Sequence, residues 1–157
     1  MHSRTYPTAQ ARLNASYLNL TLWTLQGWVA MFFIAAGYAK LTEPLTTLTA
    51  LMGWPQYVPV DLVRGVGLAE VVLALMVLTP LISWKIGRPL LVVAAAGLLV
   101  LQTVMMSVHI VMGDVGHTVV NLALILATAP LLWFRMREAC PLRQAPFARQ
   151  RSEQNFT

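Results

Sequence analysis

Four long apolar segments constrain the fold of this chain more than any other feature. They cover approximately residues 20–39, 62–81, 89–112 and 118–134. A helix needs about 20 apolar residues to cross roughly 30 Å of hydrocarbon. With 57% hydrophobic and only 11% charged residues, the chain has too little polar surface to cover a soluble globule. The sequence therefore predicts an all-α membrane protein, a bundle of four transmembrane helices.

The basic residues predict how the chain is oriented. They precede the first predicted helix, join the second to the third and follow the fourth: Arg4, Arg12, Lys85, Arg88, Arg135, Arg137, Arg143, Arg149 and Arg151. Because Lys and Arg accumulate on the cytoplasmic side, both termini should face the cytoplasm. We expect a cytoplasmic N-terminal arm at residues 1–19, a transmembrane domain at residues 20–134 and a basic cytoplasmic tail at residues 135–157. The net charge of +5 is thus explained by topology, without nucleic acid as a partner.

The connection between the first two predicted spans carries a helical pattern of its own. Pro44 suits the start of a helix, where its missing N–H costs nothing, and apolar residues then recur at helical spacing over residues 45–52. Trp54 and Tyr57 follow, and such aromatic residues settle at the level of the lipid headgroups. We expect a short amphipathic interfacial helix that covers the outer loop as a lid, and Asp61 as the N-cap of the second span.

Polar residues from all four predicted spans fall at similar depth, in the outer half of the membrane. Going from Arg64 to Glu70 advances about 9 Å along the second span. Lys40 ends the first span, His109 lies one turn from the outer end of the third, and Asn121 lies one turn into the fourth. Helical side chains lean toward their own N-terminus, so the side chains of Glu70, Lys40, His109 and Asn121 lean toward one another. We take these four residues and Arg64 as the candidate ligand-binding residues.

The sequence leaves two alternatives for the residue that pairs with Glu70. An ionisable group within a membrane normally faces the bundle interior and has a partner. If Glu70 pairs with Lys40, both remain charged; if it meets only neutral Asn121 and His109, it holds a proton. The cluster also has a structural interpretation, as an interhelical contact that fixes the packing. Arg64 is expected to extend to the membrane surface instead of stacking on Glu70.

Small and amide side chains predict the helix contacts. Gly65 with Ala69 on the second span forms a small-xxx-small pair of the kind that lets two helices approach closely. Gly67 is expected to leave open space above the Glu70 carboxylate. Gln26 and Gln102, within the first and third spans, are expected to be hydrogen-bonding packing residues.

Two kinds of metal site could involve the histidines, and the sequence supports each of them less than it supports a role in packing. Met105, His109 and Met112 share one helix face, and thioether with imidazole suits copper(I), but Met is also a common gap filler in apolar cores. Haem ligation by His109 and His117 has no further support in the sequence. We therefore predict no metal site. Cys140 is the only cysteine, so a disulfide within the chain is excluded.

The residues around Lys40 and Glu70 also carry a family resemblance. Residues 33–41, FIAAGYAKL, are similar to the F-x-x-A-G-x-x-K-L signature of DoxX-like membrane proteins, and the pattern continues at Met52-Gly53-Trp54-Pro55, Arg64, Gly67 and Glu70. The resemblance covers about residues 18–134. His109 and Asn121 match single polar positions in its third and fourth helices. It implies a four-helix protein of the bacterial inner membrane.

The resemblance implies little chemistry. The family is named after a subunit associated with thiosulfate oxidation and quinone reduction, other members are linked to oxidative-stress complexes, and remote relatives act as membrane chaperones. It assigns neither an enzymatic activity nor a cofactor to this chain.

Two functional hypotheses follow. In the first, a polar pocket in the outer leaflet binds a quinone-like or lipid-like molecule, in contact with a membrane redox partner or a second copy of the chain. In the second, the chain is an accessory, assembly or chaperone subunit, and its polar cluster is structural.

Overall fold

The computed structural model describes residues 9–139, which form helices joined by short turns and contain no strand. In chain order these are α1 (Ala9–Thr42), α2 (Leu45–Met52), the 3-10 helix η1 (Trp54–Tyr57), α3 (Val60–Val77), the 3-10 helix η2 (Thr79–Leu81), α4 (Trp84–Val111) and α5 (Val115–Ala139). The four long helices are long and apolar enough to cross a membrane. The predicted all-α fold with four membrane-spanning helices is therefore confirmed.

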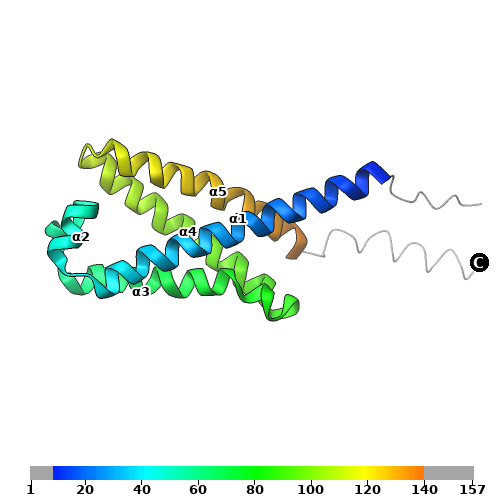
Figure 1. Ribbon diagram of the computed structural model, residues 1–157, viewed down its shortest axis with the longest axis horizontal. Coiled ribbons are helices and arrows are strands. Elements are labelled where there is room, and N and C mark those ends of the chain that lie inside the picture. Colours follow the sequence, from blue (N-terminus) through cyan, green and yellow to red (C-terminus); the bar gives the residue numbers. More distant parts are fainter. Residues whose placement is uncertain (1–8, 140–157) are drawn as a thin grey trace, which may run out of the picture.

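The long helices pair into two hairpins (Figure 1). Helix α1 packs most extensively along α3, and α4 along α5, while α3 and α4 join the two pairs. Helix α2 and η1 connect α1 to α3, and lie at the end of the bundle that also holds the turn between α4 and α5 (Figure 1). We call this end the α2 end. All four long helices thus contribute residues to it.

Two of the long helices extend beyond their apolar segments. Helix α1 has 34 residues, or about 51 Å at 1.5 Å per residue, which exceeds the bilayer core. The second half of the expected N-terminal arm is therefore helical. Helix α5 continues to Ala139, so Arg135, expected in the tail, lies in a helix and is buried, with its guanidinium 5.4 Å from the Trp23 ring and 5.1 Å from that of Trp84. Cys140 lies outside the described residues.

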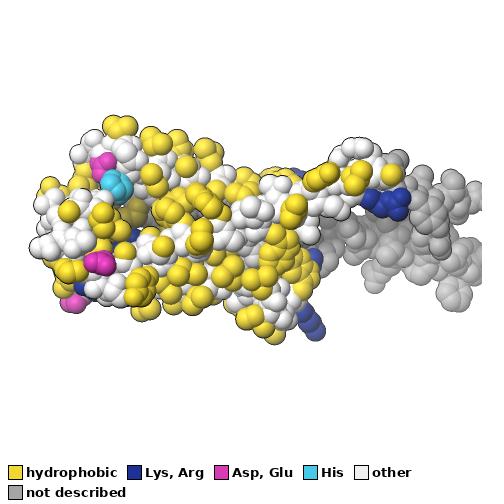
Figure 2. All heavy atoms as spheres, viewed as in Figure 1, with side chains coloured by type: hydrophobic (Ala, Val, Ile, Leu, Met, Phe, Trp, Pro, Cys, Tyr) yellow, Lys and Arg dark blue, Asp and Glu magenta, His cyan; other side chains and the backbone are white. Residues whose placement is uncertain are grey.

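The surface of the bundle is that of a protein in lipid. Large apolar side chains such as Met31, Leu75, Val100 and Leu126 are exposed on the long helices. Figure 2 shows hydrophobic side chains along the middle of the molecule, while acidic, basic and histidine side chains gather toward the ends. Exposed Leu and Val along a helix are stable where the solvent is hydrocarbon, so this pattern accords with four membrane-spanning helices.

Two amides form hydrogen bonds inside the bundle, as the sequence predicted. Gln26 Nε2 donates to the backbone carbonyl of Val77, at 2.7 Å, and thereby ties α1 to the end of α3. Gln102 Nε2 donates to Thr128 Oγ1, at 3.1 Å, and ties α4 to α5. Both glutamines are buried. In an apolar surrounding each of these hydrogen bonds ties together the two helices of one hairpin.

Helices α1 and α3 make their closest approach at two glycines. A Cβ on Gly67 would lie 2.7 Å from Lys40 Cβ and 2.9 Å from the Gly37 oxygen, and one on Gly37 would lie 2.6 Å from the Gly67 oxygen. Gly67 therefore leaves no open space above Glu70, and that prediction is wrong because the backbone of α1 fills it. The predicted contact at Gly65 is also wrong, since no atom of a neighbour lies within 4 Å of a Cβ built there.

The connection at the α2 end folds back onto the bundle. Gly53, with φ of 73°, ends α2 in a conformation that L side chains rarely adopt, and turns the chain so that Trp54 packs with Leu48 and Val63. The short helix predicted at residues 45–52 is therefore present. Asp61, predicted as N-cap, lies in the first turn of α3. The helix begins at Val60, two residues earlier than that prediction, and the carbonyl of Pro59 accepts its first hydrogen bond.

Candidate functional site

Lys40 and Glu70 form an ion pair within the bundle. Lys40 Nζ lies 2.9 Å from Glu70 Oε1 and 2.7 Å from Oε2, and both side chains are about 6% exposed. The pair forms because Gly37 and Gly67 bring α1 and α3 together one turn away from these residues on each helix. Of the two alternatives that the sequence left open, the structure has the Lys40 partner.

Arg64 caps the C-terminal end of α1. Its guanidinium, half-buried, donates to the backbone carbonyl of Lys40 and, at 2.8 Å, to that of Glu43. Carbonyls at a helix C-terminus lack partners within the helix and carry partial negative charge, so a cation bound there is stabilising. The sequence predicted that Arg64 extends to the membrane surface, but its guanidinium binds these carbonyls instead. Arg64 also does not line the cavity described next. Instead it fixes the backbone of the residue that pairs with Glu70.

A cavity of about 370 Å³ lies at the α2 end and brings four of the five predicted site residues together. Its polar lining consists of Lys40, Glu70, His109, His117 and Asn121. Its apolar lining comes from α1, α2, η1, α4 and α5, and includes Phe33, Leu51, Met52, Trp54, Met105 and Leu124. Figure 2 shows the molecule hollowed near this end. The predicted convergence of polar groups from four helices is thus present as one cavity.

The turn between α4 and α5 adds two polar groups that the sequence did not select. Asp114 Oδ1 accepts the backbone N–H of His117, at 3.1 Å, as expected of an aspartate that caps a helix start. Its other oxygen, Oδ2, lies 2.6 Å from His117 Nδ1 and 3.4 Å from His109 Nδ1. The pKa of Asp114 is lowered, mainly by the hydrogen bond from the His117 backbone, so this residue is a carboxylate at neutral pH.

The rings of His109 and His117 stack on each other, with 4.8 Å between centroids and 14° between planes. His109 is only 3% exposed, and its Nδ1 has no hydrogen-bond partner among residues 9–139, because the Asp114 oxygen lies beyond good hydrogen-bonding geometry. Asn121, one turn into α5, donates to the His117 backbone carbonyl at 2.9 Å. The Asn121 side chain thus lies against the same turn and lines the cavity with both histidines.

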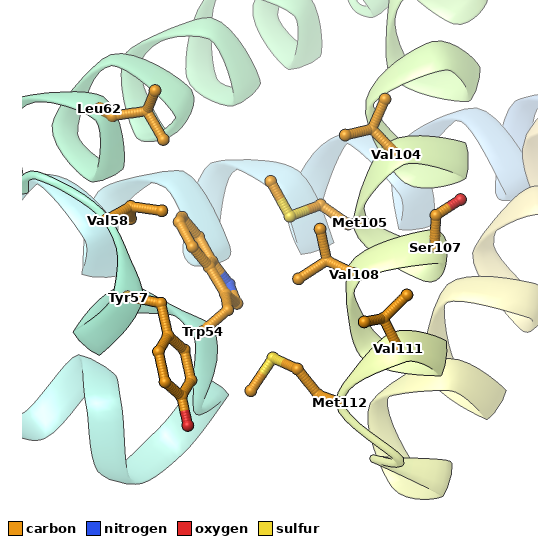
Figure 3. A pocket seen from close by; sticks show the side chains of 10 residues that line it. All are labelled: Trp54, Tyr57, Val58, Leu62, Val104, Met105, Ser107, Val108, Val111 and Met112. Carbon is orange, nitrogen blue, oxygen red and sulfur yellow. The ribbon is translucent and has the colours of Figure 1, made fainter.

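A second, almost wholly apolar groove of about 500 Å³ adjoins this cavity. Figure 3 shows its two sides: Tyr57, Val58 and Leu62 from η1 and the start of α3, and residues 104–112 from α4. Trp54 and Met105 line both the groove and the cavity, and face each other in Figure 3. A polar cavity and an apolar groove therefore share one boundary, formed by two side chains.

A family model described as the DoxX-like family matches residues 24–131, which is more than half of the chain. The chain belongs to the DoxX-like family. No curated protein and no solved structure matches it. The matched range of this DoxX-like chain includes the cavity and both signature residues, Lys40 and Glu70.

Two residues at the candidate site of this DoxX-like chain, Asp114 and His117, were not among the predicted ligand-binding residues. That prediction rested on depth along the four spans, and depth does not show that His109, Asp114 and His117 meet across the turn between two helices. The signal was an aspartate directly before a helix with a histidine three positions later, which is the spacing of a capping pair. The two methionines considered with His109 pack against the cluster of Leu48, Trp54 and Val63.

Proposed function

We propose that this DoxX-like protein binds an amphipathic small molecule, such as a quinone or a lipid, in the cavity at its α2 end. In this proposal the protein lies in the bacterial inner membrane with both termini in the cytoplasm, so that the cavity opens in the outer leaflet and α2 lies at its surface. It serves a redox-associated membrane complex. The observation that carries the proposal is the cavity, whose polar groups are gathered from four helices.

The polar lining suits a head group with both hydrogen-bond donors and acceptors. Lys40 and His109 offer donors, Glu70 offers acceptors, and the Asn121 amide offers a carbonyl oxygen, since its NH₂ group already donates to its own helix. Ligand sites are typically apolar clefts with a few converging polar groups that fix orientation. A quinone accepts through its carbonyl oxygens and its reduced quinol also donates through hydroxyls, and many lipid head groups combine ester oxygens with hydroxyl or ammonium donors, so both classes meet this description.

The groove suits the tail of the same molecule. It is apolar, it lies between η1 and α4, and it shares Trp54 and Met105 with the cavity. Met is flexible enough to move aside for a chain that passes from one compartment to the other. A free fatty tail or an isoprenoid chain therefore finds hydrocarbon-like surroundings directly beside the polar head site.

The experiment is mass spectrometry of molecules that remain with the protein after gentle purification into lipid nanodiscs. We expect one species of quinone or lipid to be enriched with the wild type over the bulk membrane extract. Glu70→Gln nearly preserves shape but removes the negative charge, and we expect it to reduce this enrichment by about 10-fold, the effect of roughly 1.4 kcal/mol. Glu43→Gln is the matched control, because Glu43 does not line the cavity, and should retain the enrichment.

A non-catalytic accessory or assembly role is the second candidate. One observation favours it: Lys40 and Glu70 already satisfy each other, and Arg64 is occupied by the end of α1, so the charged groups need no ligand. Under this role no quinone or lipid is enriched with the wild type, and Glu70→Gln loses a partner protein instead. The nanodisc experiment, with the proteins that copurify as a second measurement, separates the two candidates, because loss of one charge of the pair lowers stability under either.

A further inference from the structure

His109, Asp114 and His117 bring three metal-ligand atoms together at the rim of the cavity. One nitrogen from each ring and one carboxylate oxygen all lie within 4.8 Å of one another. His109 is buried in α4, Asp114 forms the turn, and His117 lies in the first turn of α5. The three side chains thus come from both sides of one tight turn, which holds their backbones at fixed separations.

We propose that these three residues bind a divalent first-row transition-metal ion. Imidazole suits zinc, iron, copper and nickel, and two histidines with one carboxylate occur both in catalytic zinc sites and in non-haem iron sites. The proposal goes beyond ligand binding in the cavity, because it holds whether or not a quinone or lipid occupies that cavity. The proposal also differs from the prediction made from the sequence, which was that there is no metal site. That prediction considered histidine only together with methionine or as a haem ligand.

Two of the ligand atoms already have a suitable separation, and the His117 ring must turn out of its stack on His109 for both nitrogens to face one ion. Metal–nitrogen distances of 2.0–2.1 Å and tetrahedral angles require ligand atoms about 3.4 Å apart. His109 Nδ1 and Asp114 Oδ2 are already 3.4 Å apart. His117 Nδ1 and the same oxygen are 2.6 Å apart and must separate by somewhat less than 1 Å. The His117 side chain is 40% exposed, which leaves its ring room to rotate.

The surroundings favour an ion in three ways. The buried Nδ1 of His109 has no hydrogen bond within the described residues, so a bound cation would satisfy it. The Asp114 carboxylate is oriented by the hydrogen bond from the His117 backbone to its other oxygen. Lys40, a cation that lines the same cavity, is paired with Glu70 and so adds little net repulsion.

Three protein ligands leave a coordination position for an exogenous molecule, as in catalytic zinc sites. The rings of His109 and His117 both line the cavity. A molecule in the cavity could therefore reach the ion, and an oxygen-bearing head group is the chemistry that suits it.

The test uses the full chain purified with an affinity tag that contains no histidine, stripped with a chelator and dialysed against Zn²⁺. We expect about one zinc per chain and a higher Tm with zinc than without it. His109→Gln and His117→Gln should each weaken zinc binding by more than about 100-fold, the upper range for losing an outer-shell partner. His2→Gln removes the one other histidine of the chain and is the matched control.

Two further measurements separate metal binding from helix capping. Asp114→Ser keeps an oxygen that can cap α5 but loses the carboxylate, so it should fold and bind zinc weakly. X-ray absorption of the wild type with zinc needs no variant, and should show nitrogen and oxygen ligands at about 2.0–2.2 Å. Zinc binding that is unchanged in His109→Gln and His117→Gln, sulfur in the ligand shell, or no zinc bound to the wild type would overturn the proposal.

Discussion

At the scale of single residues, Lys40 and Glu70 are stable in the bundle because each neutralises the other. Both charges are removed from water, which costs several kcal/mol per ion, and their mutual attraction offsets this only with good geometry. The geometry here is good, since one ammonium contacts both carboxylate oxygens. The pair therefore adds little net stability, but the loss of one member is costly.

This balance predicts the outcome of three variants. Lys40→Met keeps the length of the side chain but leaves Glu70 buried without its partner, and should lower the free energy of unfolding by about 3–5 kcal/mol. Glu70→Leu should cost a similar amount. The double variant, with both charges removed, should regain most of the loss. Reversible unfolding in detergent measures all three, and additive losses in the double variant would show that the two charges do not interact.

Arg64 makes a second residue-scale prediction. Arg64→Met removes two hydrogen bonds to carbonyls of Lys40 and Glu43 and should lower stability by about 1–3 kcal/mol. Arg64→Lys keeps the charge but not the fork of donors, so an intermediate loss is expected. Lys85→Met, an exposed site at the start of α4, is the control. Equal Tm values for Arg64→Met and Lys85→Met would contradict the capping role.

At the scale of helices, the apolar runs predicted the existence of every span, but not which faces meet. The chain has nine glycines, and spacing alone predicted Gly65 as a contact. Which glycine faces a neighbour depends on the rotation of α3 against α1, and this is set by the whole interface. The layer of Lys40, Glu70, His109 and Asn121 was predictable, because the depth of a residue in the membrane follows from its position in the span and the helical rise per residue.

The α1–α3 contact gives a prediction with a matched control on the same helix. Gly67→Ala places a methyl group 2.7 Å from Lys40 Cβ, so α1 and α3 must separate, at a cost of about 1–3 kcal/mol. Gly65→Ala meets no neighbour within 4 Å and should be neutral or stabilise the helix by about 0.5–1 kcal/mol. Thermal unfolding of both variants tests this, and a Gly65→Ala loss as large as that of Gly67→Ala would exclude the crossing.

At the scale of the whole molecule, charge is distributed unequally between the two ends. Away from the α2 end, Arg88 and Arg135 both lie over the Trp84 ring, at 4.8 and 5.1 Å from its centroid, and Arg137 lies over Trp133. Tryptophan with arginine is typical of a membrane interface. At the α2 end, Lys40 pairs with Glu70, and Arg64 binds a backbone carbonyl at the end of α1.

This asymmetry predicts the orientation of the protein, because Lys and Arg accumulate on the cytoplasmic side. Cys140, the only cysteine, follows α5 and should react with a membrane-impermeant thiol reagent only when the cytoplasmic side is accessible. In a Cys140→Ser background, Gln56→Cys places a thiol at an exposed position of η1, where it should react in intact cells whose outer membrane is permeabilised. Cells and inverted vesicles should thus label the two cysteines in opposite order. Labelling of Cys140 in intact cells, with Gln56→Cys protected, would place the cavity in the inner leaflet, where it would face ligands from the cytoplasmic side.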